Sequence, residues 1–150
     1  MPAPALTPTV FALLDTEWAT LAPTPLPTRW HHPARILLHL GVCHPTLGDL
    51  LRVTERRDDP AQSDQVLAAL ADLATGAANT DDGGGGLDGG HDALAARTLL
   101  QTLLPGAKAL ARRLGWLGDP QERAAAVTAT LYEQIRSYRL PGRLPVPACA

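Results

Sequence analysis

Apolar residues recur at spacings of three and four along the first part of the chain, which is typical of amphipathic helices. In residues 9–21 this pattern predicts a helix whose buried face is formed by Val10, Leu13, Leu14, Trp18 and Leu21. Residues 34–43, ARILLHLGVC, are compatible with a short helix or with a buried strand. Pro33 before this segment and Gly41 near its end favour a helix of two turns.

Two further helices are predicted before residue 77. The first carries an apolar side formed by Leu47, Leu50, Leu51 and Thr54. The second begins at Ser63, a suitable N-cap residue, and ends at Gly76. Its apolar face consists of Val66, Leu67, Leu70 and Leu73. Residues 22–33, APTPLPTRWHHP, form a proline-rich connector, because each residue before a proline is pushed toward an extended conformation.

Residues 77–91 interrupt the helical pattern. Six of the eight positions from 83 to 90 are glycine, which leaves the backbone too free to hold one conformation cheaply. This composition predicts a flexible linker between an N-terminal helical segment, residues 1–76, and a C-terminal segment, residues 92–143, with a tail at 144–150. Gly84, Gly86 and Gly89 also satisfy the spacing of a dinucleotide-binding loop, but an acidic, polar run precedes them where a strand is needed. The linker interpretation is therefore favoured.

After the linker, the pattern predicts three helices. The first contains Leu94, Leu99, Leu100 and Leu103 and is expected to stop at Pro105. The second covers residues 107–114, with Leu110 and Leu114 inward, and ends at Gly115. The third begins with Asp119 as N-cap, Pro120 at the first helical position and Glu122 completing a capping box.

This third helix has the most regular apolar repeat of the chain. A helix-packing stripe runs along it through Ala124, Val127, Leu131, Ile135 and Tyr138. Such spacing predicts packing along the whole length of the helix. Three helices are few, so we expect them to need the N-terminal helices to bury a core. Together the patterns predict an all-α protein, a small helical bundle in two pieces joined by the glycine-rich linker.

The formal net charge of −2 conceals an asymmetry along the chain. Residues 1–90 carry five basic and eleven acidic side chains, whereas residues 91–150 carry eight basic and four acidic ones. The basic C-terminal part predicts contacts with nucleic acid or with RNA polymerase. Its candidate contact residues are Lys108, Arg112, Arg113, Arg136, Arg139 and Arg143. Two alternatives stay open. Arg112 and Arg113 could have only a structural role, the stabilisation of a helix C-terminus through its dipole, and the basic face could be solvated without a partner.

The sequence offers little support for an enzyme or a metal protein. His39, Cys43 and His44, with His31 and His32 nearby, have a spacing that could hold one metal ion, but no second Cys/His pair follows. Ser63 and Ser137 do not lie in a nucleophile motif. The paired carboxylates Asp58–Asp59 and Asp81–Asp82 fall in expected turns and linkers, where they stay solvated. We therefore expect no catalytic residues, no metal, no cofactor and no small-molecule substrate.

The N-terminal residues MPAPALTPTVFALLDTEW lack a basic start, and Asp15 and Glu17 interrupt their apolar run. This pattern does not fit a signal peptide. No apolar run approaches the length that spans a membrane. Cys43 and Cys149 give no disulfide framework. These features predict a cytoplasmic protein with no membrane contact.

One pattern extends over residues 91–143. It consists of an acidic–alanine helix start, the sequence LLQTLLPGAKALARRLG, a Gly-Asp turn and a long helix that ends near IRSY. This order resembles the front of the second region of bacterial sigma factors of the extracytoplasmic-function type. The resemblance implies a helical fold, a long helix that binds the clamp helices of RNA polymerase, and a following helix that contacts the −10 promoter element.

The segment departs from the sigma-factor pattern at the positions that such proteins use. Where that family carries an acidic pair and a Gln–Glu pair on the long helix, this chain has Ala124 and Ala125, then Thr128 and Ala129. LPVPACA follows Arg143 in place of the helix that contacts the −10 element. The resemblance therefore implies a degenerate, truncated, sigma-factor-like protein, transcription-associated and with weak DNA or RNA polymerase contacts. The alternative is a helical protein–protein interaction module, binding another helical protein or itself, with no nucleic-acid role.

Overall fold

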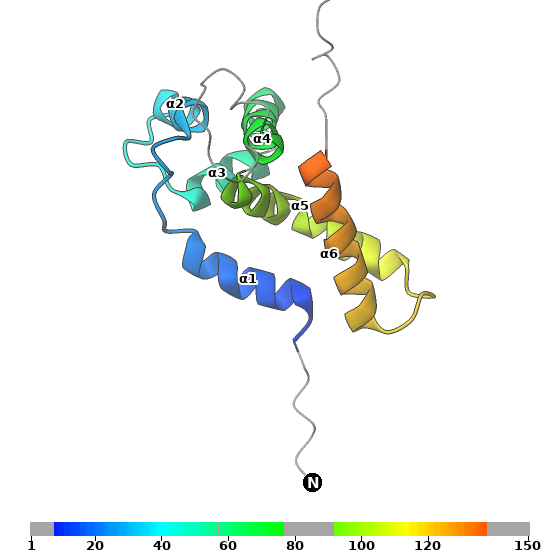
Figure 1. Ribbon diagram of the computed structural model, residues 1–150. Coiled ribbons are helices and arrows are strands. Elements are labelled where there is room, and N and C mark those ends of the chain that lie inside the picture. The colour runs from blue at the N-terminus through cyan, green and yellow to red at the C-terminus, as the bar shows by residue number, and fades with distance from the viewer. Residues whose placement is uncertain (1–7, 57, 77–91, 138–150) are drawn as a thin grey trace, which may run out of the picture.

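The computed structural model of the 150-residue chain describes residues 8–56, 58–76 and 92–137. These residues form six α-helices and no strand, which confirms the expected all-α fold (Figure 1). The helices are α1 (Val10–Leu21), α2 (His31–His39), α3 (Leu47–Glu55), α4 (Pro60–Thr75), α5 (Ala93–Arg113) and α6 (Pro120–Ser137). Helix α5 runs through the middle of the fold and contacts α1, α3, α4 and α6. The predicted linker at 77–91, Tyr138 and the predicted tail lie outside the described residues.

Short polar side chains begin several of the helices. Thr9 Oγ1 accepts a hydrogen bond from the backbone N–H of Ala12 at the start of α1. Thr46 and Asp49 form a reciprocal capping box at the start of α3. These bonds satisfy backbone donors that the first turn of a helix leaves free.

Helix α4 begins earlier than the sequence predicts. Its N-cap is Asp59, followed by Pro60 at the first helical position, and not Ser63. Ser63 lies inside the helix, where its hydroxyl donates to the carbonyl oxygen of Thr54 at 3.2 Å and so ties α4 to α3. The predicted end is correct, since Gly76 adopts a left-handed φ of 78°.

The predicted break at Pro105 does not occur. Helix α5 continues through this proline and has 21 residues in total. A proline inside a helix removes one backbone hydrogen bond and costs about 3 kcal/mol. Here the buried positions Leu100, Leu104, Ala107 and Ala111 stay in register across it, whereas Leu110, expected inward, is 49% exposed. Continuous packing of this face outweighs the lost bond. The C-terminal segment as described therefore contains two helices and not three.

The face of α1 also differs from the prediction. Leu13 is 55% exposed, while Phe11 and Trp18 are buried and Leu14 and Leu21 are half-buried. The inward positions thus follow spacings of three, four and three that start from Phe11. The hydrophobic pattern alone could not separate this register from one that started at Val10.

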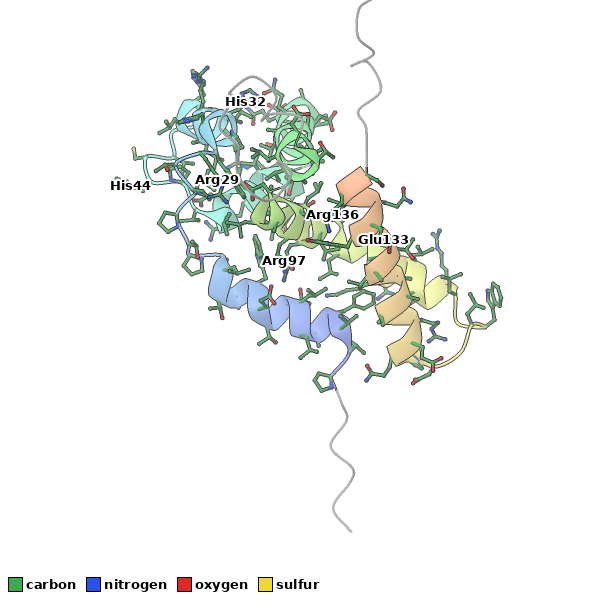
Figure 2. All side chains as sticks on the ribbon, in the orientation of Figure 1. Arg29, His32, His44, Arg97, Glu133 and Arg136 are labelled. Carbon is green, nitrogen blue, oxygen red and sulfur yellow. The ribbon has the colours of Figure 1, made fainter. Side chains whose placement is uncertain are left out.

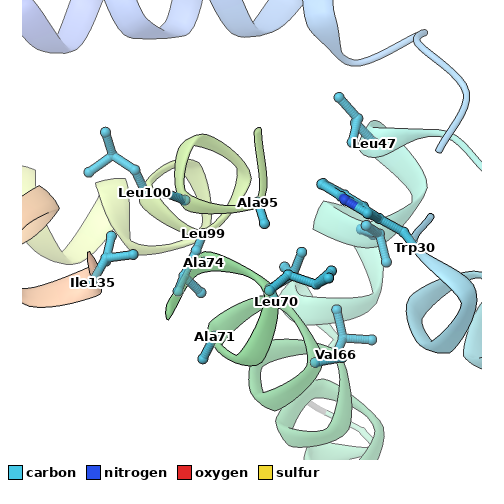
Figure 3. Close-up of a cluster of buried hydrophobic side chains, with 14 of the residues drawn as sticks. Trp30, Leu47, Val66, Leu70, Ala71, Ala74, Ala95, Leu99, Leu100 and Ile135 are labelled. Atoms are coloured by element: carbon cyan, nitrogen blue, oxygen red, sulfur yellow. The ribbon is translucent and has the colours of Figure 1, made fainter. Parts of the chain in front are cut away.

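One large core joins helices from both sides of residues 77–91 (Figure 3). Trp30, Leu47 and Leu70 are completely buried in it, next to Ala95 of α5 and Ile135 of α6. The C-terminal helices therefore do need the N-terminal ones to bury their apolar faces, as their small number led us to expect. A second, smaller cluster lies between α1, α5 and α6 and contains Phe11, Leu104, Ala107, Ala111, Ala124 and Val127.

The stripe on α6 contributes to both clusters. Ala124 and Val127 are buried in the smaller cluster and Ile135 in the larger one. Leu131 is half-buried between them and packs against both. Helix α6 thus closes the bundle over α5.

Candidate nucleic-acid interface

The structure describes four of the predicted cationic contact residues and separates Arg136 from the other three. Lys108, Arg112 and Arg113 lie in the last turns of α5. Arg136 lies near the opposite end of α6 from the loop that joins the two helices (Figure 2). Helix α6 has 18 residues, so roughly 27 Å separate its two ends. Arg139 and Arg143 are outside the described residues.

The C-terminal end of α5, the loop 114–119 and the first turn of α6 form one surface, which we call the basic end. Arg112 and Arg113 are exposed there, and Trp116 in the loop has 77% of its surface exposed. Arg123, in the first turns of α6, belongs to the same surface. None of these three arginines forms an ion pair with a carboxylate of the described residues. An exposed indole in the loop between arginines that have no carboxylate partner is the strongest candidate interface in the described chain.

The backbone of the loop 114–119 holds the side chain of Arg123 in place. Its Nη1 donates to the carbonyl oxygens of Gly115 at 2.9 Å and Gly118 at 3.2 Å. Its Nε is buried and has no acceptor among the described atoms. Arg123 is not among the contact residues predicted from the sequence. A signal was available, because long side chains in a helix lean toward its N-terminus and Arg123 stands four residues after the N-cap Asp119.

Carboxylates accompany these cations at the basic end. Asp119 Oδ1 accepts a hydrogen bond from the backbone N–H of Gln121, so this side chain serves the start of α6. Glu122 lies in the first turn of α6. Asp15 of α1 accepts from Lys108 Nζ at 2.6 Å and from Gln101 Nε2 at 3.0 Å. The hydrogen bond from Lys108 is the main cause that holds the pKa of Asp15 below its ordinary value, so this carboxylate is ionised and largely balanced by Lys108.

A cavity of about 370 Å³ lies at the basic end between α1, α5 and α6. Its charged lining consists of Lys108, Arg112, Arg123 and Asp15. Phe11 and Ala124 are among its apolar lining residues. Thr9 and Pro120, at the starts of α1 and α6, complete its rim, so two helix N-termini border the cavity.

Arg97 has a structural role that makes it unavailable for a ligand. Its Nε donates to Glu17 Oε1 at 2.7 Å and its Nη2 to the carbonyl oxygen of Leu14 at 2.8 Å. The guanidinium lies 5.8 Å from the ring centre of Trp18. These contacts hold α1 against α5, between which Arg97 is seen in Figure 2.

A second cavity, of about 550 Å³, is a groove between α4, α5 and α6. Its lining is mainly apolar, with Asp64 and Gln134 as its polar members. The apolar residues are Leu67, Ala68, Ala71, Leu99, Leu103, Leu131 and Ile135. The C-terminal half of the α6 stripe therefore forms one wall of this groove, which we call the apolar groove.

The remaining candidates from the sequence are dispersed. His31, His32, His39, Cys43 and His44 are exposed, and in the described ranges no three His, Cys, Asp or Glu side chains are placed to hold one metal ion. His32 and His44 lie at the end of the fold away from α6 (Figure 2). The hydroxyls of Ser63 and Ser137 donate to backbone carbonyls. Asp59 caps α4, while Gly84, Gly86, Gly89 and Asp81–Asp82 lie outside the described residues.

No helix in the described part of the chain is both long enough and apolar enough to cross a membrane. Comparison with protein-family models, with curated proteins and with solved structures finds no match to this chain.

Proposed function

We propose that this chain is a transcription-associated helical protein that contacts DNA through its basic end. The observation that carries the proposal is the exposure of Trp116 in the loop that joins Arg112 and Arg113 of α5 to Arg123 of α6, three arginines without a carboxylate partner in the described chain. Guanidinium groups bind phosphates, and an exposed indole can stack on an unpaired base. This combination favours single-stranded over double-stranded DNA.

The resemblance to the second region of sigma factors supports a transcriptional setting, but favours DNA over polymerase as the partner. Ala124, which matches one polymerase-facing position, is buried in the smaller core cluster, and Thr128, which matches another, is half-buried. Only Ala125 and Ala129 of the four matching positions are exposed, and neither carries a charge or an amide. The protein is thus proposed to bind DNA weakly and without strong sequence choice, and not to act as a complete sigma factor.

Fluorescence anisotropy with a labelled single strand and a labelled duplex tests this proposal at low and high salt. We expect the single strand to bind more tightly, with an affinity that falls steeply as salt rises. Arg113→Glu should weaken binding about tenfold, since it replaces a phosphate contact by a repulsion. Arg35→Glu on the exposed side of α2 is the matched control. Absence of binding to either DNA at low salt, or an equal loss in the control, would rule the proposal out.

The second candidate function is protein binding without a nucleic-acid role, and the apolar groove is the observation that favours it. The occupant that fits is an amphipathic helix of another protein, because three helices already form a groove with apolar walls. The exposed Leu103 would be its central contact. A helical partner retained by the wild-type protein at high salt, where DNA binding is lost, would support this function over the first.

A further inference from the structure

The cavity at the basic end has an excess of positive charge that the described protein does not balance. Four charged side chains line it, and two of them, Lys108 and Asp15, form an ion pair of 2.6 Å. Arg112 and Arg123 remain without a carboxylate partner among the described residues. A cavity with two uncompensated guanidinium groups is a favourable place for an anion.

Arg123 is held in place for such a role. Its Nη1 donates hydrogen bonds to two carbonyl oxygens of the loop 114–119, and its Nη2 donates to no described atom. A guanidinium group that the backbone already orders loses little conformational freedom when it binds a ligand. The buried Nε without an acceptor indicates that the hydrogen bonds of this group are incomplete in the protein alone.

The helices add to the attraction. The N-termini of α1 and α6, of 12 and 18 residues, both border the cavity. A helix N-terminus carries a partial positive charge, which favours negative groups close to it. The hydroxyl of Thr9 accepts from Ala12 and keeps its own proton for donation. These groups act together with Arg112 and Arg123.

The apolar lining narrows the class of ligand. Phe11 and Ala124 lie on the same cavity as the cations, and its volume of about 370 Å³ leaves room beyond one tetrahedral anion. We infer that this cavity binds a phosphate group that belongs to a nucleotide or to a nucleic-acid strand, with Arg112 and Arg123 at the phosphate. The inference deepens the proposed DNA contact and rests on it only for the source of the phosphate.

Isothermal titration of the full chain with inorganic phosphate, with a nucleoside monophosphate and with a short single-stranded DNA tests the inference. Arg112→Gln should weaken binding of the monophosphate about tenfold, which corresponds to the loss of one strong contact. Arg35→Gln is the matched control, because it removes the same charge from an exposed side chain on α2 that does not line the cavity. It should change the affinity for the monophosphate less than twofold. Thermal unfolding of each variant verifies that the fold is intact.

Arg123→Gln provides a second variant, and it should weaken binding at least as much as Arg112→Gln. If the DNA competes with the monophosphate, the phosphate belongs to a strand, and if it does not compete, the phosphate belongs to a nucleotide. Either result supports the inference, whereas inorganic phosphate that binds as tightly as the monophosphate would contradict the assignment to a nucleotide or a strand. No saturable binding of phosphate or monophosphate to the folded wild-type protein overturns the inference, as does an equal loss in Arg112→Gln and Arg35→Gln. DNA binding that survives Arg112→Gln and Arg123→Gln would overturn the pocket as the binding site of a strand and leave the proposed function standing.

Discussion

The indole Nε1 of Trp30 donates a hydrogen bond of 2.7 Å to Oδ2 of Asp92, although 62 positions separate the two residues. The same carboxylate accepts from Arg29 Nε at 2.8 Å and from the backbone N–H groups of Leu94 and Ala95 at 3.1 Å. Asp92 is therefore both the N-cap of α5 and the anchor of the connector between α1 and α2. Its side chain is only 6% exposed, so these donors replace the water that burial removes.

Asp92→Asn should destabilise the protein by about 1–2 kcal/mol. Asparagine still caps a helix, so the variant removes mainly the charge that Arg29 and Trp30 bind. The side chain of Arg29 is 62% exposed, and water screens its part of this loss. Asp49→Asn is the matched control, since Asp49 is also an N-terminal capping residue but pairs with the exposed Arg52. Urea unfolding measures both free energies, and an equal loss would contradict the anchoring role of Asp92.

Acid should destabilise the fold below the ordinary carboxyl pKa of 3.8. Burial raises the pKa of Asp92, but hydrogen bonds from Arg29, Trp30 and Ala95 outweigh it and leave this pKa lowered. The pKa of Asp15 is also lowered, chiefly by the hydrogen bond from Lys108. A carboxylate with a lowered pKa in the folded state contributes stability that is complete above its unfolded pKa and is lost as the pH falls through the folded value.

Urea unfolding midpoints from about pH 5 to about pH 2 measure this effect. We expect them to fall progressively over the acid part of this range, with a shallower fall in Asp92→Asn, which lacks one of the two carboxylates. An identical acid dependence in the wild type and in this variant would contradict the shifted pKa of Asp92.

Gly106→Ala should stabilise the protein by about 0.5–1 kcal/mol. Gly106 lies inside α5 on its exposed side, and a Cβ built there meets no atom within 4 Å. Alanine therefore restricts the unfolded chain without a clash in the folded one. Gly48→Ala is the contrasting variant, since its Cβ would lie 3.2 Å from the carbonyl oxygen of Ala22. Thermal unfolding should show opposite shifts, and destabilisation by Gly106→Ala would indicate that α5 is not regular beside Pro105.

The sequence predicts the helices better than their registers. Capping signals and apolar spacing locate the helices of the described residues only approximately, because both depend on residues close in the chain. They divide α5 in two and start α2 three residues late. The break expected at Pro105 is wrong, since a local rule cannot weigh the continuous contact of Leu104, Ala107 and Ala111 with neighbouring helices. The same limitation explains the exposed Leu13 and the buried Phe11 on α1. Alanines carry little hydrophobic signal, yet several of them, such as Ala95, Ala107 and Ala124, are buried in the two core clusters.

Candidate site residues depend still more on distant contacts. The sequence groups Lys108, Arg112 and Arg113 by their positive charge. Only the structure shows that Lys108 already forms an ion pair with Asp15 of α1. The turn between α5 and α6 adds Trp116 and Arg123 to the same end of the fold. Arg136 does not belong to this surface, because it lies at the other end of α6. No local sequence pattern indicates the hydrogen bond between Trp30 and Asp92, because the two residues are 62 positions apart. Residue type marks a candidate, whereas the fold decides which candidates meet.

Leu103→Asp tests whether the apolar groove binds a partner. Leu103 lines the groove and is 38% exposed, so its replacement should abolish capture of an amphipathic helix with little loss of stability. Leu131 is a less suitable choice, because it packs against both core clusters and its replacement by aspartate would also unfold the bundle. Leu110→Asp is the matched control, since Leu110 lies on the same helix, is 49% exposed and does not line the groove.

Size-exclusion chromatography with light scattering and partner capture measure the result. Equal binding by both variants would contradict a role of the groove, and a loss of DNA affinity in Leu103→Asp alone would place the nucleic acid there and not at the basic end.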